Sequence, residues 1–211
     1  MTAPKLLIDG PKDASVTVAL AHGAGAPMDS PYMNAFAEGL AGRGIRVVRF
    51  EFPYMAARRA DGRKRGPDRD PVLRASWREV IGELGRERLV IGGKSMGGRY
   101  ASMVAGDLEN EGTPVLGVAC LGYPFHPPGK PERTRTEHLR TIATPTLILQ
   151  GERDTFGRRE EVETYQLSPA VRLHWLTDGD HGFKPRKASG RTEAENWDEA
   201  IAKLADFALS L

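Results

Sequence analysis

Cysteine is almost absent from this 211-residue chain, in which Cys120 is the one example. No disulfide can form within the chain, as is expected of a protein from a reducing compartment. Because Cys120 lies in an apolar run, we expect a buried and unreactive thiol. The first ten residues lack the apolar run of a signal peptide, and no stretch approaches the length of a membrane span. These absences predict a cytoplasmic protein with no membrane partner.

A strong excess of one charge is also lacking. The net charge is +2, with 27% charged and 40% hydrophobic residues. This balance is ordinary for a globular protein and gives no support for a nucleic-acid partner. We find no internal repeat and no low-complexity segment, and the length predicts a single domain over residues 1–211. The sequence leaves open whether the protein forms a homodimer.

Apolar, β-rich segments alternate with segments of helical periodicity. Strands are expected at residues 6–8, 16–21, 45–52, 89–91, 115–121, 145–149 and 171–176. Helices are expected at residues 33–42, 72–84, 99–108, 136–141, 160–166 and 193–211, and residues 55–71 are expected to form a loop. This alternation predicts an α/β fold with a doubly wound, mostly parallel sheet of about six or seven strands and helices on both faces. Functional residues of such sheets follow the carboxyl ends of the strands.

One turn between a strand and a helix carries a serine. It reads Gly93-x-Ser95-x-Gly97, the pattern of a nucleophile elbow. Strand and helix pass so closely at such a turn that side chains two residues before or after the serine would collide. The amide of Met96, at the start of the new helix, then points to where an oxyanion would form. The alternative, a phosphate-binding loop ending in Gly-Lys-Ser, needs a glycine at Arg88 and is disfavoured.

A serine hydroxyl needs a base, and the base needs a carboxylate that fixes its tautomer. The order serine, acid, histidine that accompanies an elbow is met by Ser95, Asp154 and His181. Asp154 and His181 each follow an expected strand, so both can reach the site. Asp178 and Asp180 are alternatives that could instead shape the turn before His181, and Glu152 is a reserve.

The second oxyanion amide is expected in the loop after residues 16–21. This loop has small residues that let the backbone approach a substrate, and Ala24 is the first choice for the donor, with Gly25 the alternative. We count His22, Gly23 and Gly25 as candidate substrate contacts. A dinucleotide-binding reading of Gly23-x-Gly25 fails because the third glycine position is Met28.

These motifs together resemble the α/β-hydrolase superfamily over nearly the whole chain. The segments 92–99, 52–54 and 151–154 are similar to the small, capless subfamily named for a testis-expressed protein and for a subunit of the non-specific-lethal chromatin complex, which is distantly similar to dienelactone hydrolases. The resemblance implies a hydrolase core in which Ser95, Asp154 and His181 are nucleophile, acid and base. It implies no particular substrate. The short segment between residues 121 and 154 leaves little room for a lid.

Basic residues gather near the expected site. Residues 55–71 contain six basic and three acidic residues, and Lys94 and Arg99 flank the nucleophile. A solvated loop is one reading, and a funnel for an anionic substrate or a partner surface is the other. We expect Lys94 and Arg99 to contact the substrate, or Arg99 to anchor the loop.

The sequence therefore predicts a serine hydrolase that acts on a small ester or thioester through an acyl-enzyme, without metal or cofactor. The alternative is a non-catalytic protein-interaction module on the same fold, which the chromatin-complex relative and the basic loop suggest. A complete set of Ser95, Asp154 and His181 argues against the module, because binding alone does not need all three.

Overall fold

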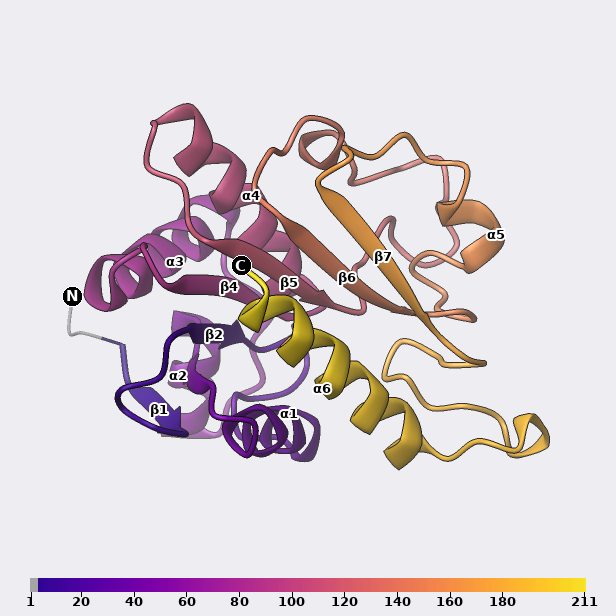
Figure 1. Ribbon diagram of the computed structural model, residues 1–211, viewed down its shortest axis with the longest axis horizontal. Helices are drawn as coiled ribbons and strands as arrows, with labels where there is room; N and C mark the ends of the chain where they lie inside the picture. Colours follow the sequence, from indigo (N-terminus) through magenta and orange to yellow (C-terminus); the bar gives the residue numbers. More distant parts are fainter. Residues whose placement is uncertain (1–3) are drawn as a thin grey trace.

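A seven-stranded sheet forms the centre of the computed structural model, which describes residues 4–211 (Figure 1). The strands are β1 (Leu6–Asp9), β2 (Thr17–Ala21), β3 (Arg46–Phe50), β4 (Leu89–Lys94), β5 (Gly117–Leu121), β6 (Thr146–Gly151) and β7 (Val171–Leu176). Their order is β1-β3-β2-β4-β5-β6-β7, and only β1 pairs antiparallel to its neighbour. The central strands are buried on both faces, which explains their continuous apolar runs. The predicted mostly parallel sheet is confirmed.

Helices cover both faces of this sheet. They are α1 (Pro31–Ala41), α2 (Pro53–Asp61), α3 (Asp70–Leu84), α4 (Met96–Asn110), α5 (Arg159–Val162) and α6 (Glu193–Leu209), with 3₁₀ turns at His138–Arg140 and Lys187–Ser189. One core lies between the sheet and α1 with α6, and the other between the sheet and α2, α3 and α4. Figure 1 shows α6, in yellow, lying across one face beside α1. This is the α/β-hydrolase fold.

No cap covers the carboxyl edge of the sheet in the part of the chain that the structure describes. The connection between β5 and β6 contains only the 3₁₀ turn His138–Arg140, which packs beside α4. The carboxyl edge of the sheet is therefore built only from the loops that follow the strands.

Three expected elements are wrong in their extent or type. The short helix expected at 136–141 is the 3₁₀ turn His138–Arg140. The helix expected at 160–166 is the single turn α5. Residues 53–61, most of which were expected to begin a loop, form α2. Pro53 supplies the fixed φ that suits a first helical position, and Gly62 ends the helix in left-handed geometry. Tyr54 and Met55 anchor the helix in the core.

Candidate active site

Ser95 occupies a strained turn between β4 and α4. Its φ of 51° and ψ of −112° lie in a region that non-glycine residues rarely adopt. The Ser95 amide donates to the carbonyl oxygen of Leu121 at 3.0 Å, and its carbonyl oxygen accepts from Arg99 N–H at 3.0 Å. These bonds hold the turn in place, and Ser95 lines a pocket at the carboxyl edge of the sheet.

The two glycines of the elbow have no room for a side chain. A Cβ on Gly93 would collide with the carbonyl oxygen of Ala21, and φ there is +148°. A Cβ on Gly97 would lie 2.5 Å from the same oxygen and 2.7 Å from that of His22. The prediction that close approach requires glycine at both positions is confirmed, because β2 passes directly against the turn.

Asp154 and His181 form a hydrogen-bonded pair at the same edge. His181 Nδ1 lies 2.7 Å from Asp154 Oδ2, although 27 residues separate them. The Asp154 side chain is fully buried and also accepts from Gln150 Nε2 at 3.0 Å and from Phe156 N–H at 2.9 Å. The His181 ring lies against Phe156, with centroids 4.4 Å apart. An ionised Asp154 selects the tautomer with hydrogen on Nδ1 and leaves Nε2 as a base.

Ser95 and His181 line one pocket of about 300 Å³. No hydrogen bond from Ser95 Oγ is present among residues 4–211. Catalytic hydrogen bonds of this kind are often long or absent before substrate binds. Asp154, His181 and Ser95 thus gather at one edge, as the sequence predicts.

The alternative acids have other partners. Asp178 binds Arg186 and Arg153, and Asp180 accepts from the amides of Gly182 and Lys184. Glu152 accepts from Arg159. The remaining histidines lie outside the pocket lining, and His126, His138 and His174 contact Glu161, Ser102 and Glu199, respectively.

The loop after β2 presents its backbone to this pocket. Gly23, Ala24 and Gly25 line it. The Gly23 carbonyl oxygen lies 2.7 Å from Nδ1 of His22, and Nε2 of His22 accepts from Phe52 N–H at 3.1 Å. Because a trans peptide points its C=O and N–H in opposite directions, this bond turns the Ala24 N–H away from His22. No hydrogen bond from the Ala24 or Met96 amide occurs within the described residues.

His22 therefore supports the loop on the side away from the pocket and does not line the pocket. Its side chain is fully buried, and burial lowers its pKa, which keeps the ring neutral. The expectation that His22 contacts the substrate is wrong for this geometry, because both ring nitrogens are already engaged. His22 is a positioning residue for the Gly23–Ala24 peptide.

Helix α2 supports the same loop from outside, which sequence reasoning missed. Tyr54 Oη donates to the carbonyl oxygen of Ala24 at 3.0 Å and lies 3.4 Å from that of Gly23. Arg58 donates to Gly25 at 3.5 Å. The signal available in the sequence was Pro53 followed by Tyr54, a proline start with an aromatic residue that has to be buried.

Lys94 lines the pocket with its ammonium group already occupied. Nζ donates to the backbone carbonyl of His181 and lies 5.2 Å from the Tyr32 ring centroid and 5.4 Å from that of Phe183. Burial lowers the pKa of Lys94 to about 8, against the opposing pull of the Asp154 and Asp180 charges. Lys94 therefore ties the His181 loop to the nucleophile strand, where the sequence predicted a substrate contact.

Arg99 is absent from the pocket lining, contrary to expectation. Its guanidinium carbon lies 5.2 Å from the Tyr100 ring centroid, and its charge helps to lower the pKa of His138 and Arg135. No hydrogen bond or ion pair joins Arg99 to residues 55–71 in the described chain, so the anchoring role is not found either.

Carboxylates pair with two of the six cations in the basic segment 55–71. Arg59 binds Glu51 and Asp29, and Arg65 binds Asp61. Asp68 accepts from the Tyr54 N–H at 2.8 Å. These contacts give Arg59, Arg65 and Asp68 structural roles.

The pocket wall is mostly apolar. Its side chains come from the loop after β2, from α1 and from the loop after β6: Ala26, Tyr32, Met33 and Phe156. Residues 4–211 contain no cluster of three or more His, Cys, Asp or Glu side chains suited to a metal ion. None of the described helices has the length and apolar character needed to cross a bilayer. Cys120 is buried as expected, and burial raises the pKa of its thiol.

The strand order and the elbow at the carboxyl edge define an α/β hydrolase. Residues 14–209 match the model of the alpha/beta hydrolase domain, so the chain belongs to this family. No curated protein matches the chain in sequence.

Solved structures support the fold. An alpha-beta serine hydrolase homologue from Coxiella burnetii is 24% identical with a TM-score of 0.67, over 94% of this chain and 90% of that one. Dienelactone hydrolase from Anabaena variabilis is 21% identical with a TM-score of 0.71, over 98% and 91%. Est1E from Butyrivibrio proteoclasticus, bound to ferulic acid, is 14% identical with a TM-score of 0.72, over 99% and 96%.

Proposed function

We propose that this protein is a serine hydrolase that cleaves small esters or thioesters through an acyl-enzyme. The observation that carries the proposal is the 2.7 Å bond between Asp154 and His181 at a pocket that Ser95 also lines. Because the buried Asp154 carboxylate binds one imidazole nitrogen of His181, the second nitrogen can act as a base in the pocket that Ser95 lines. The structural similarity to an esterase domain from Rhodothermus marinus and to dienelactone hydrolase agrees with this reaction class.

The proposed reaction has two halves. His181 Nε2 takes the Ser95 hydroxyl proton as Oγ attacks the acyl carbon, and the amides of Met96 and Ala24 donate to the oxyanion. His181 then gives that proton to the departing alcohol or thiol. In the second half, water loses a proton to His181, attacks the acyl carbon, and the Ser95 oxygen leaves and recovers the proton.

The pocket favours a compact, apolar acyl group. Its volume is about 300 Å³, at the small end of ligand sites. Tyr32, Met33 and Phe156 supply apolar wall, and the Lys94 ammonium is engaged by the His181 carbonyl. A carboxylate on the acyl group would therefore find no free cation in the pocket wall.

A fluorophosphonate probe tests the proposal. Such a probe phosphonylates only an activated serine, so we expect one adduct on the folded protein, located at Ser95 by peptide mass spectrometry. The adduct should disappear after urea unfolding and in Ser95→Ala. Folded protein that stays unlabelled, or that is labelled elsewhere, would favour the non-catalytic interaction module.

Tyr54→Phe tests the support of the oxyanion loop by α2. The variant loses the hydrogen bond to the Ala24 carbonyl, which makes the loop that carries the proposed oxyanion donor more mobile. We therefore expect kcat to fall about ten-fold while KM changes little. The measurement is a kcat and KM comparison on p-nitrophenyl acetate. Tyr165→Phe, which removes a hydroxyl bound to Glu161 outside the pocket, is the matched control and should leave kcat unchanged. Equal kcat values for the two variants would contradict the role of Tyr54.

A further inference from the structure

A second cavity lies at the opposite edge of the sheet from Ser95. It measures about 480 Å³, and its floor is formed by the first residues of β2, β3 and β4, namely Thr17, Arg46 and Leu89. These three residues are paired neighbours across the sheet, so their side chains point to the same face. The turn after α3 forms the opposing wall through Leu84 and Gly85. No residue of this cavity belongs to the proposed hydrolase site.

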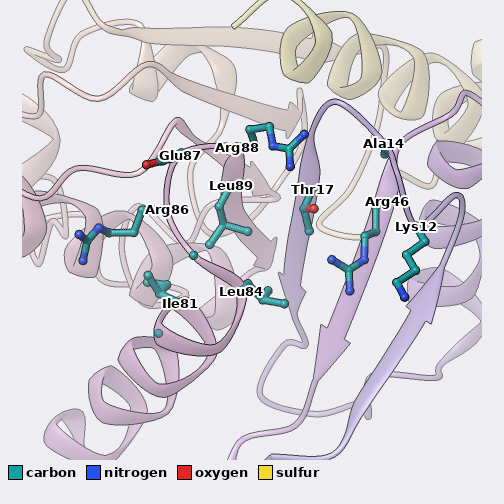
Figure 2. Close-up of a pocket in the computed structure, with 12 residues that line it drawn as sticks. Lys12, Ala14, Thr17, Arg46, Ile81, Leu84, Arg86, Glu87, Arg88 and Leu89 are labelled. Atoms are coloured by element: carbon teal, nitrogen blue, oxygen red, sulfur yellow. The ribbon is translucent and has the colours of Figure 1, made fainter.

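Positive charge dominates the lining of this cavity. Lys12, Arg46, Arg86 and Arg88 line it, and Glu87 is its one carboxylate. Figure 2 shows Lys12 and Arg46 side by side, Arg88 above them, and the guanidinium of Arg86 pointing away from the other three. We therefore take Lys12, Arg46 and Arg88 as the cationic group of this cavity.

No carboxylate of the described chain forms an ion pair with these three cations, which leaves their charge available to a ligand. Nine arginines form ion pairs: Arg49, Arg59, Arg65, Arg74, Arg78, Arg153, Arg159, Arg186 and Arg191. Within residues 4–211, no ion pair includes Lys12, Arg46 or Arg88. Nε of Arg46 is also buried without a hydrogen-bond partner. Buried donors are nearly always paired, so Nε of Arg46 can take an acceptor from a ligand, although Nε of Arg49, Arg99 and Arg191 are buried without a partner as well.

Backbone hydrogen bonds fix the main chain of two of these residues. Arg88 accepts from Thr17 N–H at 2.8 Å through its carbonyl oxygen, and Arg46 N–H donates to the carbonyl oxygen of Val16 at 3.3 Å. Both side chains therefore start from ordered strand ends, which lowers the entropy lost when they close on a ligand.

We propose that this cavity binds a small, multiply charged phosphate compound, with Lys12, Arg46 and Arg88 as its phosphate ligands. Guanidinium groups match phosphate oxygens in charge and in the geometry of paired hydrogen bonds. The volume exceeds what one phosphate fills and suits a di- or triphosphate. The hydroxyl of Thr17 supplies a further polar contact on the floor.

Isothermal titration with inorganic tripolyphosphate tests the site. At about 150 mM KCl, where exposed charges are screened, we expect saturable binding with one site per chain. The double variant Arg46→Gln/Arg88→Gln should weaken binding at least about ten-fold. The control Arg172→Gln/Lys203→Gln removes the same charge from exposed residues outside the cavity and should change affinity less than about two-fold. The single variant Arg88→Gln, at an exposed residue, keeps the test valid if Arg46→Gln does not fold.

Further arms separate the ligand sources. ADP binding at least as tightly as tripolyphosphate assigns a nucleotide, and tripolyphosphate alone assigns an inorganic polyphosphate; both support the site. Ser95→Ala should bind with unchanged affinity, because the proposal is independent of the hydrolase reaction. Failure of tripolyphosphate to saturate the protein, an equal loss in the control double variant, or binding confined to a 20-nucleotide RNA would overturn it.

Discussion

Replacing Ser95 by alanine is expected to abolish ester hydrolysis, except for the small residual activity that the remaining groups of the site provide. The variant keeps the Met96 and Ala24 amides and the Asp154–His181 pair but has no oxygen to form the acyl-enzyme. Loss of the nucleophile in comparable sites lowers kcat by about 10³- to 10⁶-fold. Alanine keeps the Cβ in the same turn, so the fold and melting temperature should change little.

The matched control for this prediction is Ser76→Ala. Ser76 is half-buried on α3, outside the pocket, and donates its hydroxyl only to the Val72 carbonyl. Its loss should leave kcat unchanged on p-nitrophenyl acetate and on a short acyl thioester. If Ser95→Ala retained more than about a tenth of the wild-type kcat, Ser95 could not be the nucleophile.

Asp154→Asn is expected to cost about 10⁴-fold in kcat, because the imidazole loses both its charge partner and its tautomer control. An asparagine with its NH₂ at the Oδ2 position would face two donors, Gln150 Nε2 and His181 Nδ1. His181 would then carry its proton on Nε2 and could not act as a base. With the amide flipped, the NH₂ faces Phe156 N–H and the carboxylate charge is still gone.

The measurement for Asp154→Asn is kcat as a function of pH. Loss of tautomer control should move the pH–rate profile along the pH axis as well as lower its maximum. Asp178→Asn is the matched control. Asp178 has a positive φ of 52°, which asparagine tolerates, and it binds Arg186 and Arg153 away from the pocket. We expect kcat within about three-fold of wild type for this variant. Similar losses in both variants would show that the turn, and not the Asp154–His181 bond, determines activity.

The elbow and the positions of Asp154 and His181 could be predicted because local rules fix them. Two glycines around Ser95 are required by the close passage of β2. The two other side chains each follow the carboxyl end of a parallel strand, and such ends meet at one edge. Strand order and the antiparallel edge strand β1 depend on long-range pairing, so the sequence predicted the sheet type without its order.

Helix α2 was missed because its support comes from far along the chain. The Tyr54 amide near its start is capped by Asp68, fourteen residues later, and Arg59 in the helix pairs with Glu51 and Asp29. Local composition therefore suggested a charged loop. The sequence also does not show in which direction a side chain points. It therefore predicted substrate contacts for His22, Lys94 and Arg99, whose side chains have other partners in the structure.

The enclosed ammonium of Lys94 has an energetic consequence for the whole fold. Its pKa is about 8 in the folded protein, against 10.5 for an ordinary lysine. Between these two values the unfolded chain holds more protons than the native one, so the contribution of this group to the free energy of unfolding increases with alkalinity, by up to about 3 kcal/mol. Below pH 8 the molecule keeps a desolvated cation beside its imidazole at a thermodynamic cost. At neutral pH the charged Lys94 ammonium therefore holds the His181 loop, and its burial lowers the free energy of unfolding.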